Sequence, residues 1–156
     1  MPRVCGIATA EVKGMPMVPR DRIQAVIGLG LFMDRYATRR GTYSGTNSAA
    51  RQVTLIHAAC IAAANNLVSK PYTFLETRRN LLIDGDINLL DLIGEQFSVG
   101  PVRMRGTEEC LPCSIPSRMA RKDDFVKYFA GRSGIRAEVL TTGFIQLRDE
   151  LVLIRS

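Results

Sequence analysis

The chain has 156 residues, 46% of them hydrophobic and 23% charged, which is the composition of an ordinary globular protein. This length fits one domain, residues 1–156, and no stretch approaches the roughly 18 to 20 apolar residues of a membrane span. The net charge of +6 favours anionic partners, whereas 6% aromatic residues and no Trp disfavour a base-stacking surface for nucleic acid.

The first half of the chain predicts two short strands and one long helix. Val4–Val12 is predicted to be a short strand, and Arg22–Ile27, which alternates, a second one that runs into Gly28-Leu29-Gly30. The third glycine of a dinucleotide-binding fingerprint is replaced by Met33, so these glycines indicate a turn that needs positive φ. Gln52–Leu67 is predicted to be the long helix, because one face is apolar at helical spacing. That face consists of Val53, Ile56, Cys60, Ala64 and Leu67.

From Asn80 onward the sequence predicts mainly strands. Leu81–Ile83 is a short strand, and Glu95–Arg105 alternates around a Gly100-Pro101 interruption that suggests a bend or bulge. Met119–Phe129 predicts a short helix. The chain closes with a predicted meander of three strands, at Arg136–Thr141, Phe144–Arg148 and Leu151–Ile154. Many short strands with one long and one or two short helices indicate a mainly β fold, a compact β-barrel without a βαβ sheet.

The segment Glu109-Cys110-Leu111-Pro112-Cys113 contains the two cysteines that look most arranged for chemistry. Their spacing suits a structural zinc site, completed by His57 and Cys60, or a redox dithiol. Sulfur transfer and ligation of a cofactor metal are further alternatives. The core-like helix face around Cys60 disfavours zinc, and the missing βαβ context disfavours a thioredoxin-like dithiol.

Arg78-Arg79-Asn80 is the second candidate group, placed where a predicted strand begins. A guanidinium group can hold a phosphate through two parallel hydrogen bonds, and an Asn amide can both donate and accept. The simpler alternative is a surface ion-pair cluster with Glu76. The tripeptide alone does not decide between the two.

Taken in order, several segments resemble the MOSC domain, the family named for the C-terminal domain of molybdenum-cofactor sulfurase, in its short stand-alone bacterial form. The matching segments are Gly28–Ala37, Gly41-Thr42-Tyr43-Ser44, Arg51–Ile56, Arg78–Gly85, Cys113 and Gly131–Ile135. Met33 and Arg148 replace glycines of the family pattern, and Cys60 stands where an acidic residue is common. The resemblance covers essentially the whole chain and implies a MOSC barrel, related to the pyruvate-kinase β-barrel.

The resemblance also implies molybdenum-cofactor (molybdopterin) binding. Cys113 would be the molybdenum ligand and catalytic residue, with Arg78 and Asn80 holding the pterin phosphate. Within the matching segments, Arg79, Asp34 and Arg51 are further cofactor-binding candidates. The implied activity is an oxidoreductase that reduces N-hydroxylated small-molecule substrates with electrons from an external donor. A protein purified from a cofactor-poor host need not contain the cofactor.

The alternative is a sulfur carrier that holds a persulfide on Cys113 for assembly of a metal–sulfur centre or cofactor. A cysteine desulfurase would then be the partner, and Cys110 could resolve the persulfide. The N-terminus lacks a signal-peptide hydrophobic region, and four cysteines in a chain of this length favour reduced thiols, so we expect a cytoplasmic protein. A small barrel with exposed edge strands is also compatible with a homodimer.

Overall fold

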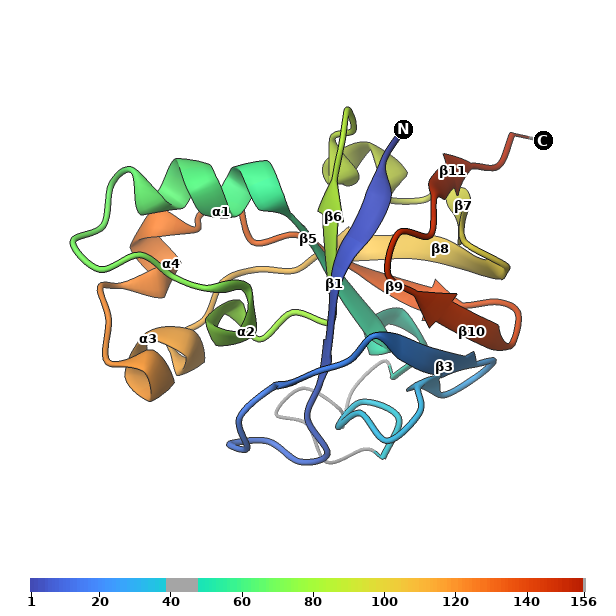
Figure 1. Cartoon of the computed structure of the whole chain (residues 1–156), viewed down its shortest axis with the longest axis horizontal. Helices are drawn as coiled ribbons and strands as arrows, with labels where there is room; N and C mark the ends of the chain where they lie inside the picture. Colours follow the sequence, from blue (N-terminus) through green and yellow to red (C-terminus); the bar gives the residue numbers. More distant parts are fainter. Residues whose placement is uncertain (39–47, 156) are drawn as a thin grey trace.

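The computed structural model describes residues 1–38 and 48–155 (Figure 1). The predicted match at Gly41-Thr42-Tyr43-Ser44 lies outside the described residues. The strands are β1 (Arg3–Thr9), β2 (Val18–Pro19), β3 (Arg22–Val26), β4 (Gly30–Leu31), β5 (Val53–His57), β6 (Leu81–Asp84), β7 (Gln96–Val99), β8 (Val102–Glu109), β9 (Ile135–Val139), β10 (Gly143–Gln146) and β11 (Leu151–Leu153). The α-helices are α1 (Ala58–Asn65), α2 (Phe74–Thr77), α3 (Ile115–Ala120) and α4 (Phe125–Tyr128), and two 3₁₀ turns are η1 (Ser48–Arg51) and η2 (Leu89–Leu92).

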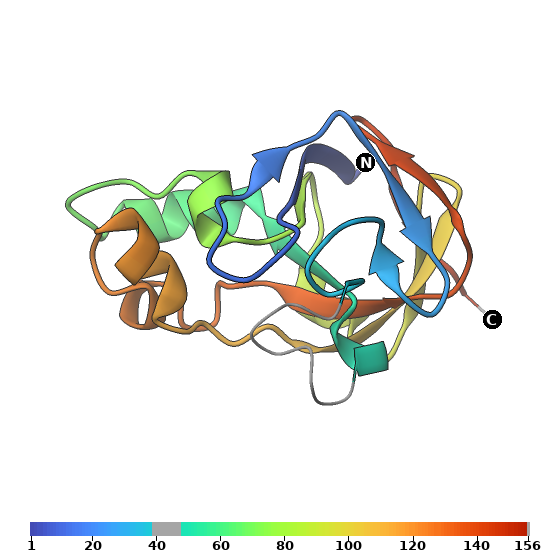
Figure 2. The same ribbon diagram turned by 90° about the horizontal axis from the view of Figure 1, so that it is seen from below.

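Eight strands form one curled sheet in the order β11-β7-β8-β9-β5-β6-β1-β2, and three form a second sheet in the order β10-β3-β4. Neighbouring strands are antiparallel except β5 and β6, which run parallel and are connected through α1. The smaller sheet lies opposite the curled one (Figure 2). The result is a half-barrel with its helices gathered at one end, which confirms the predicted mainly β, barrel-like class.

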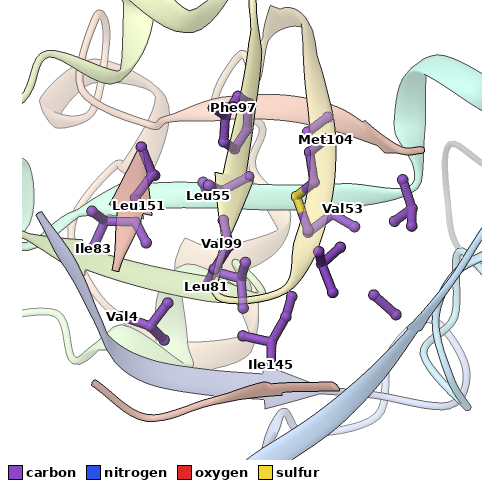
Figure 3. Packing of buried hydrophobic residues seen from close by; sticks show 14 of the residues in the cluster. Val4, Val53, Leu55, Leu81, Ile83, Phe97, Val99, Met104, Ile145 and Leu151 are labelled. Carbon is purple, nitrogen blue, oxygen red and sulfur yellow. The ribbon is translucent and has the colours of Figure 1, made fainter. Parts of the chain in front are cut away.

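The main core fills the space between the two sheets (Figure 3). Leu55, Leu81 and Phe97 of the curled sheet are fully buried and share the cluster with Ile145 of the smaller sheet. Each side chain of this size stabilises the fold by about 1.5–3 kcal/mol when removed from water. A second cluster lies among the helices, where the ring of Tyr72 contacts those of Phe125 and Phe129 edge to face at 5.4 Å.

Several sequence predictions hold. β1 (Arg3–Thr9) overlaps the expected Val4–Val12, β3 lies within Arg22–Ile27, and β6 covers Leu81–Ile83. Gly28 and Gly30 have φ values of 78° and 116°, so the glycine pair does serve a turn that favours glycine. No helix in the described part of the chain is long and apolar enough to cross a membrane.

The predicted long helix over Gln52–Leu67 is wrong. Its first half is β5, buried along Val53–Ile56 between two neighbouring strands, and only Ala58–Asn65 is helical. Leu67, placed on the apolar face, is 55% exposed. A strand buried on both sides has a continuous apolar run and no alternation, so its sequence cannot be told from a buried helix by periodicity. One βαβ connection occurs at the same place, because the parallel strands β5 and β6 are joined through α1; all other neighbouring strands are antiparallel, in agreement with the expected barrel without a βαβ sheet.

Three further features differ from prediction, two in the bounds of elements and one in strand pairing. Glu95–Arg105 is a hairpin, with Val99 opposite Val102 and Gly100-Pro101 as its two-residue turn. The predicted helix at Met119–Phe129 is two short helices, because Arg121 adopts a left-handed φ of 55° and ends the first. The three closing strands do not form a meander: β9 pairs with β5 and β8, β10 with β3, and β11 with β7. Alternation predicts a strand, but it does not specify the partner.

Candidate functional site

Cys113 is half-buried in the connection between β8 and α3, and it lines a cavity of about 30 Å³ at the junction of sheet and helices. Four arginine side chains line the same cavity, namely Arg35, Arg78, Arg79 and Arg136. The cavity shares Gly14 and Ile115 with a larger one of about 540 Å³. A thiol and four cations from distant parts of the chain therefore meet at one point.

Arg78 is presented by the end of helix α2. This short helix begins with a capping box, in which Thr73 and Glu76 satisfy each other's backbone N–H groups. Arg78 caps its C-terminus in the left-handed conformation, with φ of 62°, and its Nη1 donates to the oxygen of Met15 at 2.7 Å. Burial, together with the positive charge of Arg35, lowers the pKa of Arg78 to about 10, so the guanidinium stays charged at neutral pH. The charge of Cys113 acts on Arg78 in the opposite sense.

Arg79 is 6% exposed and is held by two main-chain oxygens. Its Nε donates to Ser133 at 2.8 Å and its Nη1 donates to Thr77 at 3.1 Å. Its Nη2 is buried and has no hydrogen-bond partner among the described residues. Buried donors are almost always satisfied, and an unpaired one costs about 1–3 kcal/mol. This Nη2 is therefore suited to an anionic acceptor supplied by a ligand.

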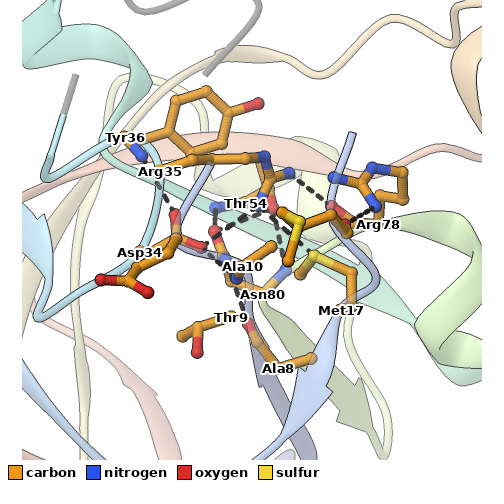
Figure 4. A network of polar contacts seen from close by, with 12 residues as sticks. Ala8, Thr9, Ala10, Met17, Asp34, Arg35, Tyr36, Thr54, Arg78 and Asn80 are labelled. Carbon is orange, nitrogen blue, oxygen red and sulfur yellow. Dashed lines mark hydrogen bonds and ion pairs between the residues drawn. The ribbon is translucent and has the colours of Figure 1, made fainter. Parts of the chain in front are cut away.

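Asp34 and Arg35 form a buried ion pair that organises the segment after β4 (Figure 4). Asp34 accepts hydrogen bonds from the backbone N–H groups of Ala10 and Tyr36 and from Arg35 Nη1, the last at 3.1 Å. Burial raises the pKa of the Asp34 carboxyl group, against the lowering effect of Arg35 and these hydrogen bonds. Asp34 does not line the Cys113 cavity, whereas Arg35 does. The carboxylate thus holds the arginine in place.

Asn80 is fully buried and connects three strands. Its Oδ1 accepts from the backbone N–H and the hydroxyl of Thr54 in β5, at 3.0 and 3.1 Å, and its Nδ2 donates to the oxygen of Ala8 in β1. Asn80 is not among the residues that line the Cys113 cavity. Its contact with a phosphate stays a prediction. In the structure its hydrogen bonds to β5 and β1 hold the start of β6, directly after Arg78 and Arg79.

Tyr36 and Arg136 complete the cavity wall and were not predicted. The guanidinium groups of Arg35 and Arg136 lie 4.6 and 5.8 Å from the centre of the Tyr36 ring. Burial lowers the pKa of Arg136, but Cys110, Tyr36 and Glu108 outweigh it and raise the pKa. Tyr36 directly follows Asp34 and Arg35, so the sequence segment that contains them could have indicated Tyr36 as a site residue. For Arg136 the sequence indicated only that it lies in a strand.

Arg51 is linked to the site through a carboxylate that it shares with Arg136. Its Nε lies 3.1 Å from Glu108 Oε1, and the same oxygen lies 3.6 Å from Nε of Arg136. Arg51 is not among the residues lining the cavity. Its predicted contact with a cofactor is untested, and the structure places it one residue away from the wall.

The structure does not bring His57, Cys60, Cys110 and Cys113 together as a zinc site. Both His57 nitrogens are engaged, Nδ1 by the N–H of Ala59 and Nε2 by the oxygen of Gly85. Among residues 1–38 and 48–155 no three His, Cys, Asp or Glu side chains are grouped to hold a metal ion. Cys110 is 1% exposed, and all four cysteines are free thiols. The two cysteines of the motif therefore differ: Cys113 faces the cavity and Cys110 lies in the interior.

Ser133 and Gly134, in the segment just before β9, hold the backbone at Cys110. The Ser133 hydroxyl donates to the Cys110 oxygen, and the Cys110 N–H donates to the Gly134 oxygen at 2.9 Å. Gly134 has φ of 90°, and a Cβ there would lie 1.9 Å from the oxygen of Leu55. Only glycine fits this close approach of two backbones.

Comparison with known protein families supplies the identification: residues 38–152 match the model of the MOSC domain. The chain belongs to the MOSC domain family. Among solved structures it is similar to the YuaD protein from Bacillus subtilis, with a TM-score of 0.81 and 18% identity, over 100% of this chain and 98% of that one. It is also similar to YiiM from Geobacillus stearothermophilus (TM-score 0.77, 15% identity, 99% and 76% covered) and from Escherichia coli (0.70, 15%, 99% and 70%). At this identity the likeness establishes the fold. No curated protein sequence matches the chain.

In this MOSC domain the structure brings together three of the six predicted site residues, Cys113, Arg78 and Arg79. The other three contact the residues around the cavity without lining it: Asp34 is paired with Arg35, Asn80 directly precedes β6 and bonds to Thr54, and Arg51 is paired with Glu108. The site is thus a thiol in a cationic cavity, braced by buried polar groups.

Proposed function

We propose that this MOSC protein binds molybdenum cofactor at the Cys113 cavity and acts as an oxidoreductase on N-hydroxylated compounds. The observation that carries the proposal is a half-buried thiol beside four arginines, one of which has a buried Nη2 without a partner in the described structure. A soft donor and anion-binding donors in one cavity match a cofactor that has both a sulfur-rich metal and a phosphate.

The residues present fit this group. Cys113 would be the protein's thiolate ligand, and Arg79, through Nη2, and Arg78 would hold phosphate oxygens. The 30 Å³ space at the thiol is narrow, and the adjoining 540 Å³ cavity offers room for the body of the cofactor. When bound, the cofactor supplies two-electron or oxygen-atom chemistry. The protein's contribution is binding, orientation and a cationic surrounding, held rigid by Asp34 and Asn80.

Metal content and pterin fluorescence of protein from a cofactor-competent host test the proposal. Cys113→Ala should lose molybdenum, while Cys5→Ala, at an exposed thiol on β1, should keep the wild-type content. Arg79→Lys keeps the charge but lacks the planar fork, so we expect reduced pterin content. Equal molybdenum in Cys113→Ala and wild type would refute the assignment of the ligand.

A second candidate, the sulfur carrier, is favoured by the accessibility of the same thiol. Cys113 is half-buried and surrounded by cations, a setting that stabilises a persulfide anion. After incubation with a cysteine desulfurase and cysteine, intact mass should rise by about 32 Da, one sulfur atom, in wild type and not in Cys113→Ala. Because Cys110 is buried, its resolving role stays a prediction; Cys110→Ala should then accumulate more persulfide.

A further inference from the structure

The cavity at Cys113 and its 540 Å³ neighbour form one basic trough between the β1–β2 connection and helix α3. Its cations are Lys13, Arg35, Arg78, Arg79, Arg118 and Arg136. The lining residues described by the structure include no carboxylate. A trough of one charge sign raises the local concentration of oppositely charged solutes and speeds their encounter.

Arg79 Nη2 is the specific indication of a ligand in this trough. It is a charged donor, buried and without a partner in the described structure, on a side chain that is 6% exposed and lines the cavity with Cys113. This donor favours an anionic oxygen in the cavity that Cys113 also lines. Any small molecule that brings a carboxylate or phosphate together with a sulfur electrophile meets both needs.

Cys5 gives an internal contrast in the same chain. It is exposed on β1 and lies near a carboxylate, since burial and then the charge of Asp84 raise the pKa of its thiol. The exposed thiol of Cys5 and the half-buried thiol of Cys113 therefore differ in the sign of the charge beside them, negative at Cys5 and positive at Cys113.

We propose that Cys113 is a modification site selective for small anionic disulfides, of which oxidised glutathione, with two carboxylates per tripeptide, is the type. The Cys113 thiolate attacks one sulfur of the disulfide, the S–S bond breaks, and one glutathione thiolate leaves with the electron pair. The Cys113 sulfur is oxidised and the departing sulfur is reduced, so no further oxidant is needed. The retained glutathione places its carboxylates on the trough arginines. This inference does not depend on cofactor binding, and a modified Cys113 cannot ligate a metal.

The test compares two disulfides of opposite charge on purified protein freed of small thiols. Oxidised glutathione and cystamine are reacted in parallel, and peptide mass spectrometry with fragment ions that separate Cys113 from Cys110 gives the initial rate at each cysteine. The glutathione-to-cystamine rate ratio at Cys113 should exceed that at Cys5 by about tenfold at low ionic strength. Salt at about 1 M should remove most of this difference. Taking ratios at both thiols cancels the intrinsic reactivity of each reagent.

Variants at the exposed rim keep the buried structure intact. Arg118→Gln and Lys13→Gln should each lower the ratio at Cys113 about two- to threefold, whereas Arg103→Gln, at an exposed residue of a separate cavity, should not. Coenzyme A disulfide, which carries phosphates where oxidised glutathione carries carboxylates, is tested in parallel. A faster reaction of either one than of cystamine at Cys113 supports the proposal, and the faster of the two shows which anionic group the cavity prefers. Equal ratios at Cys113 and Cys5, or a Cys113 ratio unchanged by salt and by both rim variants, would overturn it.

Discussion

Arg35 donates from Nη2 to the main-chain oxygen of Arg78, with 2.9 Å between the two atoms. The contact connects the segment after β4 to the left-handed end of α2, where φ of Arg78 is 62°. Arg35 Nη1 at the same time contacts Asp34 Oδ1 at 3.1 Å. The backbone that presents Arg78 to the cavity therefore depends on a carboxylate that does not line it.

Removing Arg35 should destabilise the fold strongly. In Arg35→Gln the buried Asp34 carboxylate loses its counter-charge, and we expect a loss of about 3 kcal/mol in the free energy of unfolding, measured with urea. Arg3→Gln is the control, since its pair with Glu150 has the same type of contact, at 2.9 Å, on the surface, and should cost less than about 1 kcal/mol. Similar losses in the two variants would contradict the buried ion pair as an organising contact.

A double-variant cycle separates the pair from the fold around it. Asp34→Asn combined with Arg35→Gln removes both charges of this buried pair, so the double variant should lose less stability than the sum of the single losses. Strict additivity would mean that the two side chains act independently.

Asn80→Ala should cost about 2–4 kcal/mol in the free energy of unfolding. The substitution leaves the Thr54 N–H and the Ala8 oxygen without their Asn80 partner in a fully buried place. Asn66→Ala, at the exposed end of α1, is the matched control and should change stability by less than about 1 kcal/mol. A small effect of Asn80→Ala would leave direct ligand contact as its main role.

Glu76 should make stability depend on pH through the helix that presents Arg78. Burial alone raises the pKa of Glu76, but hydrogen bonds from Lys122, at 2.5 Å, and from Thr73 outweigh it and lower the pKa. A carboxyl group whose pKa is lowered on folding stabilises the protein above its unfolded pKa, and this contribution disappears as pH falls through the folded pKa.

Glu76→Gln keeps the cap acceptor and removes the charge. The difference in free energy of unfolding between wild type and Glu76→Gln should therefore be largest near about pH 6 and shrink towards about pH 3. Lys122→Met should also weaken the pH dependence of the free energy of unfolding, because it removes a group that lowers the pKa of Glu76. A difference that stays constant over this range would show that the charge of Glu76 does not contribute.

Local patterns located most of the longer strands, with β5 as the exception, but not the partners of those strands. Strands were expected at Val4–Val12 and Arg22–Ile27, and β1 and β3 lie there within a few residues of those bounds. Val53–His57 is buried along nearly its whole length, and Ala58–Asn65 follows without a break, so the boundary between strand and helix leaves no trace in periodicity. Pairing of β10 with β3 and of β11 with β7 is set by tertiary contacts that no local pattern encodes.

The sequence predicted those residues of the candidate site that lie in recognisable motifs. Cys113, Arg78 and Arg79 lie in the two segments that looked arranged for chemistry, and the structure joins them. Arg136 belongs to an ordinary strand, and its place beside Cys113 follows from the pairing of β9 with β8. Asn80, in contrast, belongs to one of these segments, yet its side chain bonds to the neighbouring strands and does not line the cavity.

Met33 and Arg148, the two departures from glycine in the family pattern, both stand at left-handed backbone positions, with φ of 64° and 77°. Only four described non-glycine residues have positive φ, and Arg78 and Arg121 are the other two. The backbone thus keeps the conformation that glycine favours and tolerates a side chain there. A left-handed conformation costs a non-glycine residue about 1–2 kcal/mol, whereas glycine loses more conformational entropy on folding, about 0.5–1 kcal/mol.

Comparison of glycine with alanine at position 33 isolates this backbone term, because both substitutions remove the Met side chain. Met33→Gly should be more stable than Met33→Ala by about 0.5–1 kcal/mol in urea unfolding. The neighbouring Phe32 is also exposed, is not among the positive-φ residues, and should show the opposite order, with Ala more stable than Gly. The same sign at both positions would mean that the backbone at Met33 is not left-handed in solution, and the segment leading into Asp34 and Arg35 would then differ from the structure described.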